Sequence, residues 1–337
     1  MSESDQGERR LRLRPVPCDY CGAEESEPYL SGPDRLCGLE GEFHVVRCAR
    51  CGLLRTNPQP VPEDLPKAYP ASYEVHEASV RRPDPPTGWL RWALVNYRNY
   101  PLGKRAPAPV RALFWPVLIP RLRHRDGIAY LPYEGEGRML DFGCGVGAYV
   151  ARMRAAGWDA EGMDLVAEPV RAGREAGLPL CQGTLPGADL PSSHYDVVTL
   201  WHVLEHVPRP KATLQACREI LKPGGRIAVV SPMSDSLLAD RFGSCWYGLD
   251  VPRHLTHFTQ ATLARHLEAA GFGLDRAVPI RRPTFARRSF RYLAEETGRP
   301  LHHRLGRSRL VARLLSHVAR LLRRTDEVLF LARRPEA

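Results

Sequence analysis

The sequence contains no run of about 18 apolar residues, the length that a membrane-spanning helix requires. The best candidate, residues 113–119, is short and contains Pro116. The start of the chain, MSESDQGERRLRLRP, lacks the apolar core of a secretory signal peptide. We therefore expect a cytoplasmic protein without a membrane span. In that reducing compartment, nine cysteines favour metal binding over disulfides.

Acidic residues are scarce in two stretches of the chain. Residues 81–126 contain 10 Lys and Arg against 2 Asp and Glu, and residues 281–337 contain 15 against 5. The rest of the chain is net acidic, although the whole chain carries +10. A composition of 43% hydrophobic and 26% charged residues is globular and excludes disorder throughout, and 337 residues suit a large domain with an accessory one.

Four cysteines occur in two matched Cys-x-x-Cys-Gly sequences, at residues 18–22 and 48–52. Each such turn lets two thiolates converge on one ion, and two turns complete a tetrahedral site of the kind that zinc prefers. The predicted ligands of a structural zinc ion are Cys18, Cys21, Cys48 and Cys51. A redox-active pair is the alternative, but the strand and helix of a thioredoxin-like motif are missing. Cys37, in the intervening loop, is an alternative ligand.

A short apolar strand at residues 138–142 runs into Gly143, Gly145 and Gly147, and a helical pattern follows at residues 148–156. Strand, glycine turn and helix in this order form a nucleotide-binding loop, because glycines let the backbone approach a ligand without a Cβ. Proteins that bind NAD, FAD or S-adenosylmethionine (SAM) all use variants of this loop. The loop alone therefore does not identify the ligand.

Two carboxylates favour SAM among these ligands. Asp141 is part of the first strand, just before the turn, where a carboxylate attracts a cationic amino-acid group and repels a dinucleotide pyrophosphate. Asp164 ends a second strand, at residues 160–164, about 20 residues past the loop, where acidic groups bind ribose hydroxyls.

Four segments in the right order resemble the motifs of class I SAM-dependent methyltransferases. They are LDFGCGVG at 140–147, GMD at 162–164, YDVVTLWHVLEHV at 195–207 and LKPGGRIAVV at 221–230. The resemblance covers residues 131–280 and a closing strand at 327–334. It implies an α/β, Rossmann-like sheet of seven mostly parallel strands with the last one antiparallel, and SAM lying across the strand ends.

The same resemblance assigns the cofactor contacts. The three glycines border the methionine part of SAM, and Asp164 binds the ribose. Leu165 packs on the adenine, and the stretch after the third strand edges the ring where many relatives carry an acidic residue. The predicted cofactor-binding residues are Asp141, Gly143, Gly145, Gly147, Asp164, Leu165, Thr184, Leu185 and His202.

Two clusters contain candidate catalytic residues. In the first, His202, Glu205 and His206 share a face if their turn is helical. His206 is then a general base, or the three residues form a divalent-metal site similar to that of metal-dependent O-methyltransferases of quinone biosynthesis, or they line the SAM pocket.

The second cluster is the segment CWYGLDVPRHLTHF at residues 245–258, which suits an acceptor lid. Here His254 is the first choice for the base, with Tyr247 and Arg253 as orienting groups. A salt bridge of Asp250 or Arg253 that ties this loop to the domain is the alternative.

The segments GLDVPRH at 248–254 and CGLLRTNP at 51–58 resemble bacterial methyltransferases of polysaccharide, glycolipid and natural-product biosynthesis, which often carry an N-terminal zinc ribbon. We therefore predict three parts. They are a zinc ribbon at 14–62, a Pro-rich connector with a basic, aromatic helical segment at 63–130, and a SAM-binding domain at 131–337 with a basic helical insertion at 281–326.

The insertion contains a predicted amphipathic helix at residues 309–324, with leucines and valines on one side and arginines elsewhere. Three interpretations of this helix are open. Its apolar side packs on the sheet or on residues 81–126, the helix contacts the inner face of an anionic membrane, or its arginines bind nucleic acid. Residues 81–126, with three tryptophans among their basic residues, allow the same partners.

These features predict a SAM-dependent methyltransferase that acts on a hydroxyl, or less favourably on a carbon, of a small-molecule or lipid-linked biosynthetic intermediate. An RNA methyltransferase that grips RNA with the ribbon and the basic segments is one alternative. A non-catalytic module that binds SAM and zinc is another. The sequence does not specify the acceptor or the oligomeric state.

Overall fold

The computed structural model describes residues 11–69, 83–122 and 130–336. The chain divides into two compact units. Unit 1 comprises Met1–Tyr73, Trp201–Gln215 and Val229–Ala332, and unit 2 comprises Glu74–Leu200, Ala216–Ala228 and Arg333–Ala337. In the part of the chain that is described, no helix is long and apolar enough to cross a bilayer.

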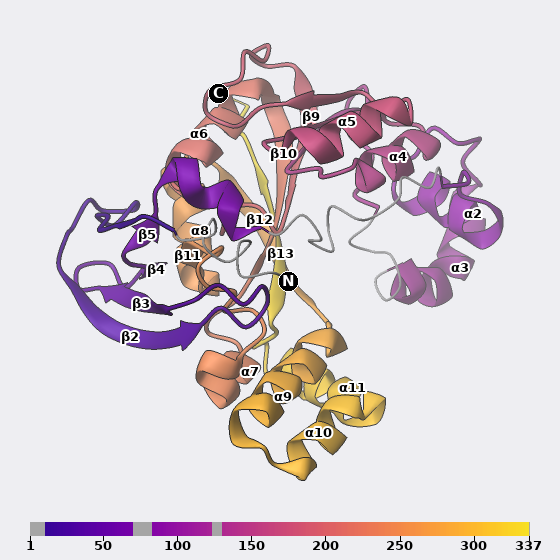
Figure 1. Ribbon diagram of the computed structural model, residues 1–337. Helices are drawn as coiled ribbons and strands as arrows, with labels where there is room; N and C mark the ends of the chain where they lie inside the picture. Colours follow the sequence, from indigo (N-terminus) through magenta and orange to yellow (C-terminus); the bar gives the residue numbers. More distant parts are fainter. Residues whose placement is uncertain (1–10, 70–82, 123–129, 337) are drawn as a thin grey trace. The chain divides into compact units, whose positions relative to one another are not determined.

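Seven strands form one sheet in the order β12-β13-β10-β9-β6-β7-β8 (Figure 1). The strands are β6 (Arg138–Phe142), β7 (Asp159–Asp164), β8 (Leu180–Gln182), β9 (Tyr195–Trp201), β10 (Leu221–Pro232), β12 (Gly273–Ile280) and β13 (Glu327–Arg333). β6 pairs in parallel with β7 and β9, and β7 pairs in parallel with β8. The predicted α/β class and the seven-stranded sheet are confirmed.

Helices connect these strands, as parallel pairing requires. They are α4 (Ala148–Ala155), α5 (Ala167–Glu175), α6 (Pro210–Ile220) and α8 (Gln260–Ala269). The central strands β6 and β9 are almost wholly buried, which explains why they are nearly continuous apolar runs in the sequence. Thr259 caps α8 through a capping box with Thr262, and this fixes where the acceptor-lid segment ends.

Two helices in unit 2, α2 (Gly88–Tyr97) and α3 (Ala108–Arg121), form the described part of the basic, aromatic segment. Their aromatic rings pack edge to face, with ring centroids 5.3 Å apart for Trp92 and Phe114 and also for Tyr97 and Trp115. These aromatic residues therefore hold the helix pair together, although Trp115 remains 52% exposed.

The N-terminal ribbon belongs to a four-stranded sheet with the order β11-β4-β3-β2. Its strands are β2 (Ser26–Pro33), β3 (Glu42–Cys48), β4 (Leu54–Thr56) and β11 (Thr256–His257), and a separate pair is formed by β1 (Leu13–Arg14) and β5 (Gln59–Pro60). A 3-10 helix, η1 (Pro62–Ala68), follows this pair. The strand β11 comes from the predicted acceptor lid, so this loop completes the ribbon sheet.

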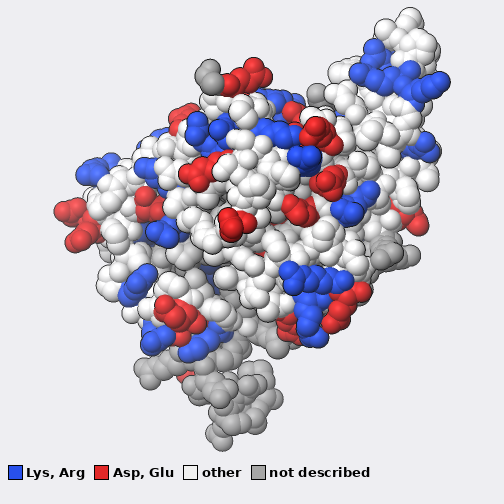
Figure 2. All heavy atoms as spheres, turned by 90° about the horizontal axis from the view of Figure 1, so that it is seen from above, with Lys and Arg blue, Asp and Glu red and all other residues white. Residues whose placement is uncertain are grey.

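The predicted helical insertion before the last strand is present. It consists of α9 (Pro283–Thr297), α10 (Pro300–Arg307) and α11 (Arg309–Leu321), which group together in Figure 1. Phe285 and Tyr292 of α9 enter a core with Trp246, near α7 (Leu237–Phe242) and η3 (Gly243–Cys245). On most of the face shown in Figure 2, basic and acidic side chains are interspersed. The basic excess does not form one continuous patch there.

Candidate functional site

The glycine turn in unit 2 has the backbone that its sequence requires. Gly143, Gly145 and Gly147 have φ angles of 77°, 54° and 81°, in the left-handed region that favours glycine. A Cβ on Gly147 would lie 2.8 Å from Leu178 and 3.0 Å from Leu180. This turn therefore leaves no room for other residues at Gly147.

Asp164 is positioned by the same turn. One carboxylate oxygen accepts the N–H of Gly145 at 2.8 Å, and the other accepts the N–H of Val166 at 2.9 Å. The adjacent Leu165 is 55% exposed, which is unusual for a large apolar side chain. A carboxylate next to an exposed apolar surface is the combination that a ribose and an adenine ring need.

Asp141 is fully inside the fold, where it accepts a 2.6 Å hydrogen bond from the Thr199 hydroxyl. Burial raises the pKa of Asp141 to about 7, with a smaller contribution from the charge of Asp164 and opposition from the Thr199 hydrogen bond. Of the two residues expected at the adenine edge, Thr184 is exposed and Leu185 is buried.

The four knuckle cysteines of unit 1 converge, as predicted. Their Sγ atoms all lie within 4.8 Å of one another, with Cys18 to Cys51 at 3.4 Å and Cys21 to Cys48 at 3.6 Å. A tetrahedral zinc site with Zn–S bonds of about 2.3 Å requires S–S distances of about 3.8 Å. The thiols therefore fit a zinc ion. Cys37 is not part of the cluster.

The glycine of each knuckle allows this geometry. Gly22 and Gly52 have φ angles of 72° and 75°, and each donates its N–H to the first cysteine of its turn. The first knuckle also caps α6, because the Asp19 carboxylate accepts the N–H of Lys211 at 2.9 Å. The ribbon is thus anchored to the first turn of α6, which belongs to the same unit.

His206 and His254 lie together, although the sequence places them in separate clusters. Their ring centroids are 4.6 Å apart and their planes are nearly perpendicular. The cause is a backbone connection, since the carbonyl of Glu205 accepts the N–H groups of Leu255 at 2.7 Å and Thr256 at 3.1 Å. Pairing of β11 with β4 holds the same segment from its other side.

Hydrogen bonds at Nδ1 fix how each ring can react. His254 Nδ1 lies 3.0 Å from the carbonyl of Gly248, and His206 Nδ1 lies 3.1 Å from the carbonyl of Arg253. Because a carbonyl only accepts, we assign the proton to Nδ1 in both rings, which leaves a lone pair on each Nε2. The Tyr69 hydroxyl, 2.9 Å from His206 Nδ1, then acts as a second acceptor.

Burial favours the neutral form of both imidazoles. Burial lowers the pKa of His254 well below 6.5, and the neighbouring His206 and His257 lower it further. Burial also lowers the pKa of His206, against the opposing charge of Glu205. A neutral imidazole with a free lone pair is the state that a general base requires.

The turn that carries His202 and Glu205 is not helical, so the condition for a shared face is not met. His202 instead has a φ of 56° and contacts two buried carboxylates, with Nδ1 3.3 Å from Glu205 and Nε2 3.2 Å from Glu327. Glu205 joins His206 and His254, with their ligand atoms within 4.8 Å of one another. Among the described residues, the three-ligand groups do not include His202.

Arg253 is a buried clamp. Its guanidinium donates to Asp34 at 2.9 and 2.5 Å, to Asp250 at 2.9 and 2.6 Å, and to the carbonyl of Ala68 at 3.1 Å. The Arg253 side chain is completely buried. The salt bridge that the sequence left as an alternative is therefore present, and it ties the loop to both Asp34 and η1.

Tyr247 faces the helical insertion. Its hydroxyl accepts a 2.6 Å hydrogen bond from Arg288 of α9, and the Arg288 guanidinium stands 4.7 Å from the centre of its ring. Its orienting role stays a prediction.

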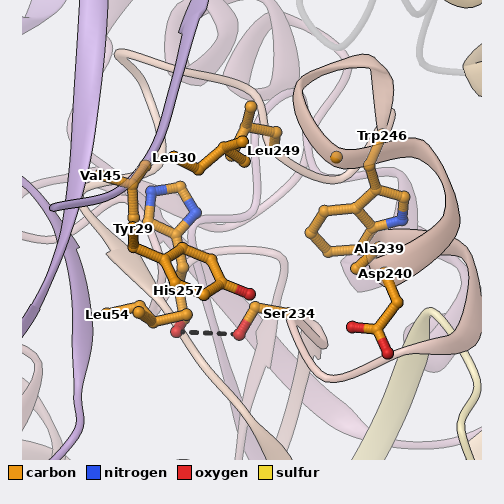
Figure 3. Close-up of a pocket in the computed structure, with 11 residues that line it drawn as sticks. Tyr29, Leu30, Val45, Leu54, Ser234, Ala239, Asp240, Trp246, Leu249 and His257 are labelled. Carbon is orange, nitrogen blue, oxygen red and sulfur yellow. Dashed lines mark hydrogen bonds between the residues drawn. The ribbon is translucent and has the colours of Figure 1, made fainter.

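A pocket of about 300 Å³ in unit 1 lies between the ribbon sheet and the acceptor-lid segment. In Figure 3, Trp246 and His257 face it from opposite sides. Its lining comprises Tyr29, Leu30, Val45, Leu54, Ser234, Ala239, Asp240, Gly243, Trp246, Leu249 and His257. The size is at the lower limit for small-molecule pockets. This pocket is a second candidate ligand site.

Sequence reasoning missed three residues of these sites, namely Asp34, Tyr69 and Glu327. Asp34 lies in the sequence GPDRLCGL, whose Gly, Pro and Asp residues are typical of a turn. In the structure the Asp34 carboxylate accepts the N–H groups of Leu36 and Cys37, as an aspartate in a turn does. Nothing local to Tyr69 or Glu327 indicates their histidine partners.

Comparison with known proteins finds similarity to methyltransferases. Residues 117–277 match a family model described as a methyltransferase domain. Ubiquinone biosynthesis O-methyltransferase of Pectobacterium atrosepticum is 39% identical over 111 residues, which cover 30% of this chain and 46% of that protein. The enzyme of the same name from Photorhabdus laumondii is 37% identical over 97 residues, covering 27% and 40%. The chain thus spans less than half the length of these relatives.

Among solved structures, a SAM-dependent methyltransferase from Thermotoga maritima has a TM-score of 0.44 at 16% identity, covering 67% of this chain and 96% of that chain. Another from Mesorhizobium loti has a TM-score of 0.41 at 19% identity, covering 66% and 97%. The seven-stranded sheet thus has the class I methyltransferase fold, and residues 117–277 within it match the methyltransferase-domain model.

Proposed function

We propose that the chain transfers a methyl group from SAM to a hydroxyl of a small-molecule or lipid-linked biosynthetic intermediate. The observation that carries the proposal is the glycine turn whose backbone positions the Asp164 carboxylate, within a segment that matches a methyltransferase domain. The matched relatives are named O-methyltransferases, which supports oxygen as the attacked atom.

The residues present fit SAM. Asp164 would hold the ribose hydroxyls, the exposed Leu165 would cover the adenine, and the glycine turn would border the methionine part. SAM, when bound, supplies an electrophilic methyl group on a sulfonium. The rate of such an in-line displacement depends chiefly on positioning and on exclusion of water.

The acceptor hydroxyl must lose a proton during the transfer. Nε2 of His254 is our first candidate to take this proton, and Nε2 of His206 is the second. Nδ1 of each ring stays protonated on a backbone carbonyl, which keeps the lone pair on Nε2. The base is therefore ready without a preceding proton transfer.

The test of the function combines SAM binding with transfer of a radioactive methyl group to fractionated cell extract. Label in the small-molecule or lipid fraction is the expected result, whereas label confined to RNA supports the RNA alternative. If the protein binds no SAM in calorimetry, the proposal fails. SAM binding without any transfer identifies a non-catalytic module.

Two variants separate binding from chemistry. Asp164→Asn removes a charged acceptor and should weaken SAM binding by about tenfold or more, while Asp159→Asn at the exposed start of the same strand should not change it. His254→Ala should lower the transfer rate by about 10² to 10⁴ and leave SAM affinity unchanged. The exposed His44 gives the matched control, His44→Ala.

We also propose that the four knuckle cysteines hold one structural zinc ion. Support comes from the S–S distances and from the capping of α6 by the first knuckle. Metal analysis of protein purified without chelator should find one zinc per chain. Cys48→Ser should lose this zinc, and Cys37→Ser should keep it. Zinc retained by Cys48→Ser at the wild-type level would exclude this ligand set.

A further inference from the structure

The helix α11 exposes four of its larger apolar side chains, whereas Leu315 is partly buried against the core. Leu310, Leu314, Val318 and Leu321 are 68%, 55%, 43% and 69% exposed. They are spaced i, i+4, i+8 and i+11 and so form one line along the helix, which we call the leucine ridge. The opposite side of α11, with Ala312, Ser316 and Ala319, is buried. Packing of the apolar side on the fold, one of the three alternatives for this helix, therefore does not hold for these four residues.

A second line of side chains runs beside the leucine ridge. Arg309, Arg313 and Arg320 are exposed, and each lies one residue before a member of the leucine ridge. His317 lies one residue before the remaining member, Val318. We call Arg309, Arg313 and Arg320 the arginine ridge. The two ridges are separated by one helical step of about 100°. A helix with this pattern presents apolar and cationic groups along the same exposed side.

The charges along the segment that contains α11 are all positive. Residues 298–325 contain eight arginines and no Asp or Glu. Such a segment repels basic surfaces and favours an anionic partner. The absence of Phe, Trp and Tyr from the same residues removes the side chains that usually stack on unpaired bases, and nucleic acid would also leave the leucine ridge in water.

We propose that α11 is a peripheral membrane-binding surface that recognises anionic lipid headgroups. The leucine ridge enters the boundary between headgroups and acyl chains, and the arginine ridge contacts lipid phosphates. Amphipathic helices that lie in a bilayer interface combine apolar and basic faces in this way. The inference does not depend on methyl transfer, because vesicle binding is measured without SAM or acceptor.

The test is cosedimentation of the full chain with vesicles of phosphatidylcholine, alone or mixed with phosphatidylglycerol. Binding to the mixed vesicles and weakening by added salt are expected. Arg313→Gln/Arg320→Gln should weaken binding by about 25-fold, because each basic residue near the surface contributes about fivefold. Leu314→Ser/Leu321→Ser should weaken it by about 100-fold or more.

Matched controls come from exposed residues of other elements. Arg171→Gln in α5 and Leu274→Ser in β12 should not change vesicle binding. Circular dichroism checks that each variant folds, which is expected because the changed side chains are exposed.

Several results would overturn the proposal. One is an absence of binding to anionic vesicles, and another is binding that the ridge variants leave unchanged. Leucine-dependent self-association without vesicle binding would assign the ridge to a second copy of the chain. RNA binding that requires the arginine ridge, in a protein that ignores vesicles, would also refute it.

Discussion

The imidazoles of His206 and His254 lie edge to face, 4.6 Å between centroids, each with Nδ1 near a backbone carbonyl. The carbonyl contacts favour the Nδ1–H tautomer in both rings, which leaves a lone pair on each Nε2. Since burial lowers both pKa values, neither ring needs to lose a proton before it can accept one. The pair can therefore act as a base below the pH at which a free histidine becomes protonated.

The first prediction concerns the pH dependence of methyl transfer. The transfer rate should stay constant as pH falls through 6.5, the ordinary pKa of histidine, and decline only at lower pH. The reason is that the buried neutral imidazole resists protonation. Measurement of kcat across pH 5 to 8 at saturating SAM tests this. A decline that begins above pH 6.5 would show that another group is the base.

The contact between the two histidines could not be predicted from the sequence, whereas the glycine turn could. The strand, glycine turn and helix around Gly143 were predictable because their signals are local. The meeting of residues 206 and 254 was not, because it depends on hydrogen bonds from Leu255 and Thr256 to the Glu205 carbonyl and on the pairing of β11 with β4. Thr56 and His257, which join these strands, are 201 positions apart. A two-residue strand gives no periodic signal.

The second prediction concerns the clamp between Arg253 and Asp34. Replacement of Asp34 by Ala should lower the free energy of unfolding by about 3 to 5 kcal/mol, because it leaves a buried guanidinium without one of its partners. Urea denaturation measures the change. Glu175→Gln, which removes an exposed ion pair with Arg171, should cost less than about 0.5 kcal/mol.

A companion variant separates charge from packing at this clamp. Arg253→Met with Asp34→Leu removes both charges and should destabilise the protein less than Asp34→Ala alone. If the double variant is the less stable one, the fold depends on the ion pair itself. The sequence offered a salt bridge of Asp250 or Arg253 only as an alternative and did not indicate Asp34 as the partner. Asp34 lies 219 positions from Arg253, and its local role in a turn explains its presence equally well.

The third prediction concerns Gly147. A Cβ at this position would meet Leu178 and Leu180 at 3.0 Å or less, in a backbone conformation that already disfavours alanine. Gly147→Ala should destabilise the protein by about 1 to 3 kcal/mol more than Gly298→Ala, whose Cβ meets open space at a similar φ of 64°. It should also weaken SAM binding. Equal effects of the two variants would mean that conformational strain alone decides.

The last prediction concerns His202 and stability at alkaline pH. Burial by itself lowers the pKa of His202, but contacts with Glu205 and Glu327 outweigh burial and raise this pKa to about 10. A histidine with a raised pKa in the folded state stabilises the fold fully below pH 6.5 and loses this contribution as pH rises towards 10. The free energy of unfolding should therefore decline between these values. His202→Gln should flatten the decline, whereas the exposed His44→Gln should not. An equal alkaline decline in His202→Gln would show that the two carboxylates do not hold a charged imidazole.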